Sequence, residues 1–350
     1  MSIRVLVVDD SPSTCALIAA LIGMAGDIEV VGTTSNLPGV QAIASRLHPD
    51  VITLGLGSAE SGDNHIIERL NDLRTFTVLV ISAPGDVGSE TMLRTLELGA
   101  LDCIARPAGS NQSLAGDFAA ILTDKIRAAA NSQKQRQYSS MMHNDATANF
   151  TLRKTPHGGQ SEKILFVGAS TGGTEAIKTF LSALPENCPP ILVVQHMPPT
   201  FTGSFARRLD SLCAPHVIEA QGNERIEPGT VYIAPGHSHL IIRQSGMGYT
   251  TGLLQTLPVN RHRPSVDVLF DSAANVVADR ALGVILTGMG KDGALGLLHM
   301  RQAGARTFGQ DENSCIVYGM PREAHLIGAV EEQAPLADLA RRVLASLGRR

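Results

Sequence analysis

The chain has 350 residues, a net charge of −4, 43% hydrophobic residues and no tryptophan. At about 150 residues per domain, this length predicts two domains with aliphatic cores. Residues 1–125 hold 7 Lys/Arg and 15 Asp/Glu, whereas residues 126–350 hold 22 Lys/Arg and 18 Asp/Glu. The small excess of basic residues in the second part is weak evidence for nucleic-acid binding. No segment approaches roughly 18 apolar residues, no leader pattern opens the chain and no CxxC pair occurs. We therefore expect a reduced, cytoplasmic protein without membrane insertion.

Short apolar runs alternate with helical patterns from the first residues onward. Strands are predicted at 3–8, 29–33, 50–56, 77–82 and 102–105, and helices after them near 12–24, 37–47, 64–73, 88–98 and 113–137. This alternation predicts an α/β domain over residues 1–125, with a five-stranded parallel sheet covered on both faces.

The stretch 126–161 is polar and predicts a helix tail followed by a flexible linker. A second β-α series follows over 162–348. Its strands are predicted at 163–170, 189–197, 230–236 and 281–290, its hairpin at 239–244 and 248–255, and its helices near 174–184, 265–278 and 293–303. This series predicts a second, doubly wound Rossmann-like α/β domain that carries an antiparallel hairpin.

Two adjacent carboxylates, Asp9 and Asp10, follow the first strand, at the edge where open parallel sheets place ligands. Paired carboxylates suit Mg²⁺, although a solvated turn that caps the next helix is the simpler interpretation. Ser82 follows the fourth strand and Arg106 follows the fifth. In this order the residues resemble those of response-regulator receivers, which implies a flavodoxin-like receiver fold for residues 1–125.

The resemblance does not extend to a working phosphorylation site. Receivers carry a phosphate-accepting acid at the end of strand three, and Gly55 stands at that position. Arg106 replaces the lysine of the family, which keeps the charge but not the compact ammonium geometry. Three nearby acids begin the strand or lie beyond its end: Asp50, Glu60 and Asp63. We expect a degenerate receiver that is not phosphorylated on aspartate, because two acids alone organise Mg²⁺ poorly for in-line transfer.

The segment ILFVGASTGGTEAI places Ser170 where a strand turns into a helix. Gly172 and Gly173 allow a sharp bend, and backbone N–H groups at the helix start can face developing negative charge. A phosphate or dinucleotide loop is the alternative. It is disfavoured because the strict G-x-G-x-x-G is absent and the next strand ends in Gln195 and His196, not in a ribose-binding acid.

Ser170, His196 and Asp292 each follow a strand that is predicted to be parallel in one sheet. Taken singly, such a histidine is usually a polar surface residue, and such an aspartate usually forms a turn. Together, at one sheet edge, the three side chains form the set needed for a nucleophile, a general base and an orienting acid.

Several long blocks resemble the chemotaxis receptor methylesterase family, the protein-glutamate methylesterases. They are GASTGGTEAI, QHMPPTFTGSFARRL, YIAPGHSHL, PVNRHRPSVDVLF, GVILTGMGKDGALG and SCIVYGMPREA, and they occur in the family's order behind a receiver. The resemblance implies Ser170 as nucleophile, His196 as base, Asp292 as its partner and the Met289 N–H in the oxyanion hole. It also implies hydrolysis of γ-glutamyl methyl esters on cytoplasmic helices of methyl-accepting chemotaxis receptors, and deamidation of glutamines there. A chemotaxis histidine kinase is a further implied partner, and no cofactor or metal is implied.

Two other classes of function are alternatives to this one. A non-catalytic adaptor could bind receptors through the same fold, and a nucleotide-binding regulator could use the glycine-rich turn. The three intact residues of the Ser-His-Asp set argue against the adaptor. The missing ribose-binding acid argues against the regulator.

Overall fold

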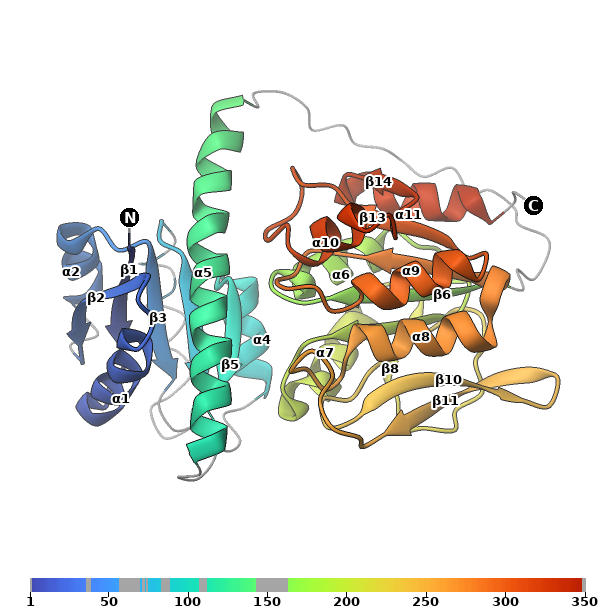
Figure 1. Cartoon of the computed structure of the whole chain (residues 1–350), viewed down its shortest axis with the longest axis horizontal. Helices are drawn as coiled ribbons and strands as arrows, with labels where there is room; N and C mark the ends of the chain where they lie inside the picture. Colours follow the sequence, from blue (N-terminus) through green and yellow to red (C-terminus); the bar gives the residue numbers. More distant parts are fainter. Residues whose placement is uncertain are drawn as a thin grey trace. The chain divides into compact units, whose positions relative to one another are not determined.

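The computed structural model describes residues 2–35, 39–56, 70, 73, 75–82, 89–106, 112–142 and 163–347. This part of the chain forms two compact units, each built on its own parallel sheet (Figure 1). Among the described helices, none combines the length and apolar character that a membrane crossing requires. Most of the predicted helix near 64–73, and the predicted linker beyond residue 142, lie outside the described residues.

The N-terminal unit has the predicted five-stranded parallel sheet, in the flavodoxin-like order β2-β1-β3-β4-β5. Its strands are β1 (Ile3–Val8), β2 (Ile28–Thr34), β3 (Val51–Leu56), β4 (Val78–Ser82) and β5 (Asp102–Ala105). Its helices are α1 (Pro12–Gly23), α2 (Val40–Leu47), α4 (Ser89–Glu97) and α5 (Gln112–Met142). Every residue of β3 and β4 is buried, which explains their nearly continuous apolar sequences.

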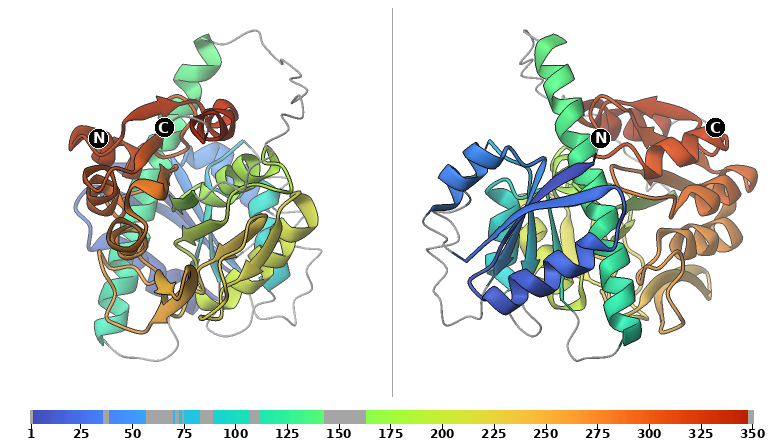
Figure 2. Two further views of the ribbon diagram at one scale, coloured as in Figure 1. Left: turned by 90° about the vertical axis from the view of Figure 1, so that its right-hand side faces the viewer. Right: turned by 60° about the vertical axis from the view of Figure 1, so that its left-hand side comes forward.

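Local sequence signals place the helices of this unit. α1 begins after Ser11, whose side chain accepts a hydrogen bond from the backbone N–H of Thr14. α5 extends to Met142, a few residues beyond the predicted end of this helix near residue 137. Arg127 of α5 forms a bidentate ion pair with Asp27, in the turn between α1 and β2. α1 and α5 therefore lie on the same face of the sheet (Figure 2).

The C-terminal unit has a seven-stranded parallel sheet in the order β14-β13-β12-β6-β7-β9-β8, together with a separate antiparallel hairpin, β10-β11. The sheet consists of β6 (Ile164–Ala169), β7 (Ile191–Gln195), β8 (His216–Glu219), β9 (Thr230–Ile233), β12 (Ala281–Ile285), β13 (Arg306–Gln310) and β14 (Glu332–Ala334). The hairpin consists of β10 (His239–Ser245) and β11 (Gly248–Leu254). The parallel sheet and the hairpin were predicted, whereas β8, β13 and β14 were not.

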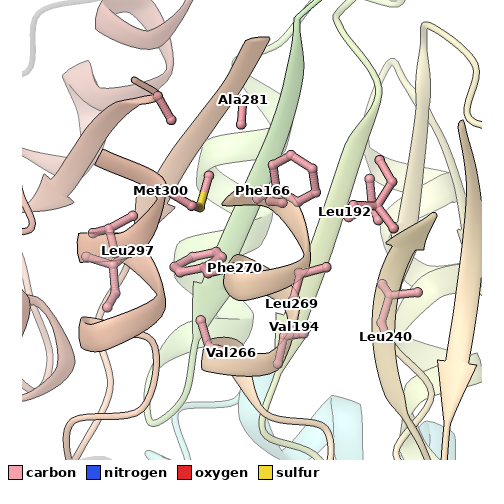
Figure 3. Packing of buried hydrophobic residues seen from close by; sticks show 14 of the residues in the cluster. Phe166, Leu192, Val194, Leu240, Val266, Leu269, Phe270, Ala281, Leu297 and Met300 are labelled. Carbon is pink, nitrogen blue, oxygen red and sulfur yellow. The ribbon is translucent and has the colours of Figure 1, made fainter. Parts of the chain in front are cut away.

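Helices cover both faces of this sheet. They are α6 (Gly173–Ser182), α8 (Val266–Val276), α9 (Ala294–Gln302), α10 (Met320–Leu326) and α11 (Leu336–Ser346), with a short 3-10 turn at Ala278–Arg280. A further helix, α7 (Pro199–Leu212), follows β7 in the chain. Figure 3 shows α8 packed on the face of the sheet, with Phe270 of α8 near Phe166 of β6. Both rings are fully buried, and burying each such side chain stabilises the fold by about 1.5–3 kcal/mol. α8 also contacts β10 of the hairpin.

The position of β6 within the sheet explains where a site can form. β6 lies between β7 and β12, and the chain leaves it toward β7 but returns later at β12 to build the other half of the sheet. Such a reversal of strand order opens a crevice beyond the carboxyl ends of the strands. Ser170, His196 and Asp292 all follow strands of this central trio.

Candidate active site

Ser170 is the first residue after β6 and is 5% exposed. Its N–H donates to the Thr287 carbonyl over 3.1 Å. Its own carbonyl accepts from the Gln195 side-chain amide over 2.8 Å and from the Gly173 N–H over 2.7 Å. The backbone of the turn at Ser170 is therefore fixed by the loop after β12, by the end of β7 and by the start of α6.

A close backbone approach places the loop after β12 directly beside Ser170. A Cβ on Gly288 would lie 2.8 Å from the Ser170 Cβ, so only glycine fits there without movement. The Gly288 carbonyl accepts from the backbone N–H groups of Gly319 and Met320, over 3.1 and 2.8 Å. These bonds hold the following peptide, that of Met289, next to the turn at Ser170.

His196 follows β7 as Ser170 follows β6. The strands pair with Ala169 opposite Gln195, so Ser170 and His196 are the next pair beyond the strand ends. The His196 side chain is 5% exposed, and its Nε2 bonds to Asp292 Oδ2 over 2.8 Å. Its Nδ1 is buried without a hydrogen-bond partner, so of the two ring nitrogens this is the one with no bond in the structure. The bond from Ser170 to Nδ1 is not formed in this structure; in sites without substrate such bonds are often long and tighten on binding.

Asp292 is held by hydrogen bonds from several elements. Its Oδ2 accepts from His196 and from the backbone N–H of Val266, over 2.8 and 2.7 Å. Its Oδ1 accepts from the Asn260 amide and the Ser265 hydroxyl, over 2.8 and 2.7 Å. Val266 opens α8, so the carboxylate also meets the positive end of that helix. Burial alone would raise the pKa of Asp292, but the bonds from His196, Asn260 and Ser265 outweigh it and hold this pKa well below its usual value.

A second carboxylate supports the first. Asp267 accepts from the Asn260 amide over 2.7 Å and from the Gly296 N–H over 2.7 Å, so Asn260 bridges Asp267 and Asp292. Burial, partly offset by the bond from Gly296, raises the pKa of Asp267, and the neighbouring Asp292 charge adds to the rise. Asn260 and Asp267 were not identified from sequence, although both lie in the PVNRHRPSVDVLF block.

In the N-terminal unit, the Asp9 carboxylate occupies the space beside Gly55, where receivers carry their phosphate-accepting acid. Val8 pairs with Leu54, so Asp9 lies beside Gly55 at the ends of β1 and β3. A Cβ on Gly55 would lie 1.9 Å from Asp9 Oδ2, so the buried Asp9 carboxylate occupies the space of a side chain at position 55. Asp9 Oδ1 accepts from the Ser11 N–H over 2.9 Å. Burial raises the pKa of Asp9, although the bond from Ser11 and the Arg106 charge partly offset it.

The other predicted receiver residues lie at the same sheet edge. Ser82 ends β4 and is buried, whereas Asp10 is exposed. Arg106 follows β5, and its guanidinium donates to the Thr14 hydroxyl over 3.0 Å. Among the described residues, no group of three histidine, cysteine or acidic side chains is arranged to hold a metal ion.

Comparisons with known proteins place the chain in a family. The family model for CheB methylesterase matches residues 165–343. A protein-glutamate methylesterase/protein-glutamine glutaminase 1 of Dechloromonas aromatica is 55% identical over 98% of both chains. A protein-glutamate methylesterase/protein-glutamine glutaminase of Nitrosomonas europaea is 47% identical over 99% of this chain and 96% of its own. The catalytic domain of the Thermotoga maritima CheB methylesterase superposes with a TM-score of 0.51 and is 38% identical, covering 52% of this chain and 97% of that domain. The chain therefore belongs to the CheB methylesterase family.

Proposed function

We propose that this protein hydrolyses γ-glutamyl methyl esters, and deamidates glutamines, on the cytoplasmic helices of methyl-accepting chemotaxis receptors, using Ser170, His196 and Asp292. The observation that carries the proposal is the His196–Asp292 pair beside the fixed Ser170 turn, in a chain whose whole-length relatives are named for both activities. These substrates place the enzyme in the cytoplasm.

The first half of the reaction forms an acyl-enzyme. Ser170 Oγ attacks the ester carbonyl while His196 Nδ1 removes the hydroxyl proton, giving a tetrahedral oxyanion. The bond from carbon to the methoxy oxygen then breaks, and the proton on His196 passes to that oxygen, so methanol leaves. For a glutamine substrate, ammonia leaves in the same way.

The second half restores the enzyme. Water attacks the acyl carbon, His196 takes its proton, and the bond to Ser170 Oγ breaks as that oxygen is reprotonated, leaving a glutamate side chain on the receptor. The Met289 N–H, beside the nucleophile turn, supports the oxyanion in both halves. Asp292 stays ionised throughout, because the donors around it hold its pKa low, and it stabilises the imidazolium form of His196.

We further propose that residues 1–125 form a receiver that is not switched by aspartyl phosphorylation. Position 55 offers no oxygen nucleophile, and the Asp9 carboxylate fills the space above it. A chemotaxis histidine kinase can then act on this protein only by binding it. The catalytic unit comprises residues 162–348, and residues 126–161 connect the two.

Methanol release from receptor membranes with radiolabelled methyl groups tests the proposal. The wild-type chain should release methanol, and Ser170→Ala should lose several orders of magnitude in rate while it melts at the same temperature. Receptor binding by the wild-type chain without methanol release would instead support an adaptor.

A further inference from the structure

A second histidine lies flat against the catalytic base. The rings of His196 and His262 are stacked, with centroids 3.7 Å apart and an angle of 10° between their planes. His262 is half-buried and follows neither β6, β7 nor β12, so it reaches the site from a separate loop.

Backbone hydrogen bonds close a tight turn where the loop carries this ring. Val259 and His262 exchange two backbone hydrogen bonds, of 3.0 and 2.9 Å, across a two-residue turn. Both central residues, Asn260 and Arg261, have positive φ, at 52° and 66°, as in the primed turns that close tight hairpins. Asn260 is also bonded to Asp292 and Asp267. One short turn thus contacts both the acid and the base of the proposed triad.

The stack fixes the orientation of the His196 ring, which the hydrogen bonds of His196 do not fix by themselves. The imidazole is held by the single bond from Nε2 to Asp292, and Nδ1 has no partner. A ring held at one atom can tilt about that bond, which would move Nδ1 away from the nucleophile. A parallel ring at van der Waals distance on one face blocks this tilt.

We infer that His262 is a positioning residue, whose ring stack holds His196 in the plane that presents Nδ1 to Ser170. The inference rests on the proposed Ser-His-Asp mechanism. This role requires a flat ring at position 262, and it does not depend on ionisation of that ring or on hydrogen bonds that it makes. The inference also assigns Asn260 the role of anchoring the turn to the carboxylates.

The test compares His262→Leu, which removes the flat ring, with His262→Phe, which keeps one. His216→Leu is the control, because His216 is an exposed histidine that begins the edge strand β8. Each full-length variant is assayed for methanol release from receptor membranes and for the rate at which a small alkyl fluorophosphonate modifies Ser170. The second assay reports the alignment of nucleophile and base without receptor docking, and melting temperatures report the fold.

His262→Leu should lower kcat and the phosphonylation rate by the same factor and leave KM unchanged. We expect a factor of about three to ten, because this is the change in rate that corresponds to the energy of one aromatic ring stack. His262→Phe should recover both rates to within about twofold, because it keeps the stack. Wild-type rates in the leucine variant, or equal defects in both variants, would overturn the inference. A raised KM with unchanged phosphonylation would assign His262 to substrate binding instead. Absence of methanol release and of Ser170 modification in the wild-type chain would overturn the proposed function itself.

Discussion

Replacing Asp292 with asparagine removes the charge at the centre of the proposed triad while keeping the side-chain shape. One carboxylate oxygen accepts from His196 and Val266, and the other accepts from Asn260 and Ser265. An asparagine has one acceptor oxygen, so its NH₂ group must face one of these pairs of donors. At least one buried donor then loses its acceptor, at a cost of about 1–3 kcal/mol for each such group. We expect Asp292→Asn to lower the free energy of unfolding by about 2–4 kcal/mol at neutral pH.

The same substitution should affect catalysis more than stability. If the NH₂ group faces His196, the imidazole must carry its proton on Nδ1, and that nitrogen can no longer act as base. In a serine protease the corresponding change lowers kcat about 10⁴-fold, and we expect a loss of that order here. The assay is methanol release by protein shown to be folded. Asp271→Asn, an exposed change on α8, is the control. A loss below about tenfold in the folded variant would refute the assigned role of Asp292.

The pH dependence gives an independent check. The pKa of Asp292 is lower in the folded state than the unfolded value of about 3.9, so its stabilising contribution is complete above that pH. The contribution is lost as the pH falls through the folded pKa. The difference in unfolding free energy between wild type and Asp292→Asn should therefore be constant near neutrality and shrink below about pH 4. A difference that grows in acid, measured by urea unfolding, would contradict this sign.

Four further outcomes follow from local packing. Wild-type protein incubated with acetyl phosphate and Mg²⁺ should gain no phosphoryl mass, and a phosphorylated wild-type chain would refute the proposal that the receiver is not phosphorylated. Gly55→Asp should unfold at a lower urea concentration than the wild type, because its Cβ would meet the Asp9 carboxylate. Gly288→Ala should lower methanol release, since the new methyl would lie 2.8 Å from the Ser170 Cβ, and unchanged activity would mean that the loop moves freely. Lys125→Met should lower the free energy of unfolding by about 3–5 kcal/mol, because it leaves the buried Asp102 carboxylate, 2.5 Å from Lys125 Nζ, without its ion-pair partner. An unchanged free energy of unfolding in urea would refute that pairing.

Most of the candidate site could be predicted because its residues directly follow predicted strands. Ser170 and His196 stand directly after apolar runs, and parallel strands end at one edge, so their proximity follows from periodicity alone. The strands that were not identified are short or polar: β8 is His216–Glu219 and β14 is Glu332–Ala334. Such segments owe their conformation to a neighbouring strand more than to their own pattern.

The supporting residues could not be predicted in the same way. His262 and Asn260 lie in a loop between elements, and their contacts depend on the path of a tight turn over the end of β7. The sequence offers an asparagine, which favours positive φ, but gives no sign of which side chains the turn meets. The absence of an acid at Gly55 was evident from sequence, whereas the placement of the Asp9 carboxylate over it required coordinates.

Locating the modified residue after treatment with a fluorophosphonate tests the central claim most directly. The reagent loses fluoride to an activated serine, and peptide mass spectrometry then identifies the residue that carries the phosphonyl group. We predict a single adduct on Ser170, with methanol release falling in proportion to its occupancy and no adduct in Asp292→Asn over the same time. An adduct on another residue that abolishes methanol release, or full activity with Ser170 modified, would contradict the account.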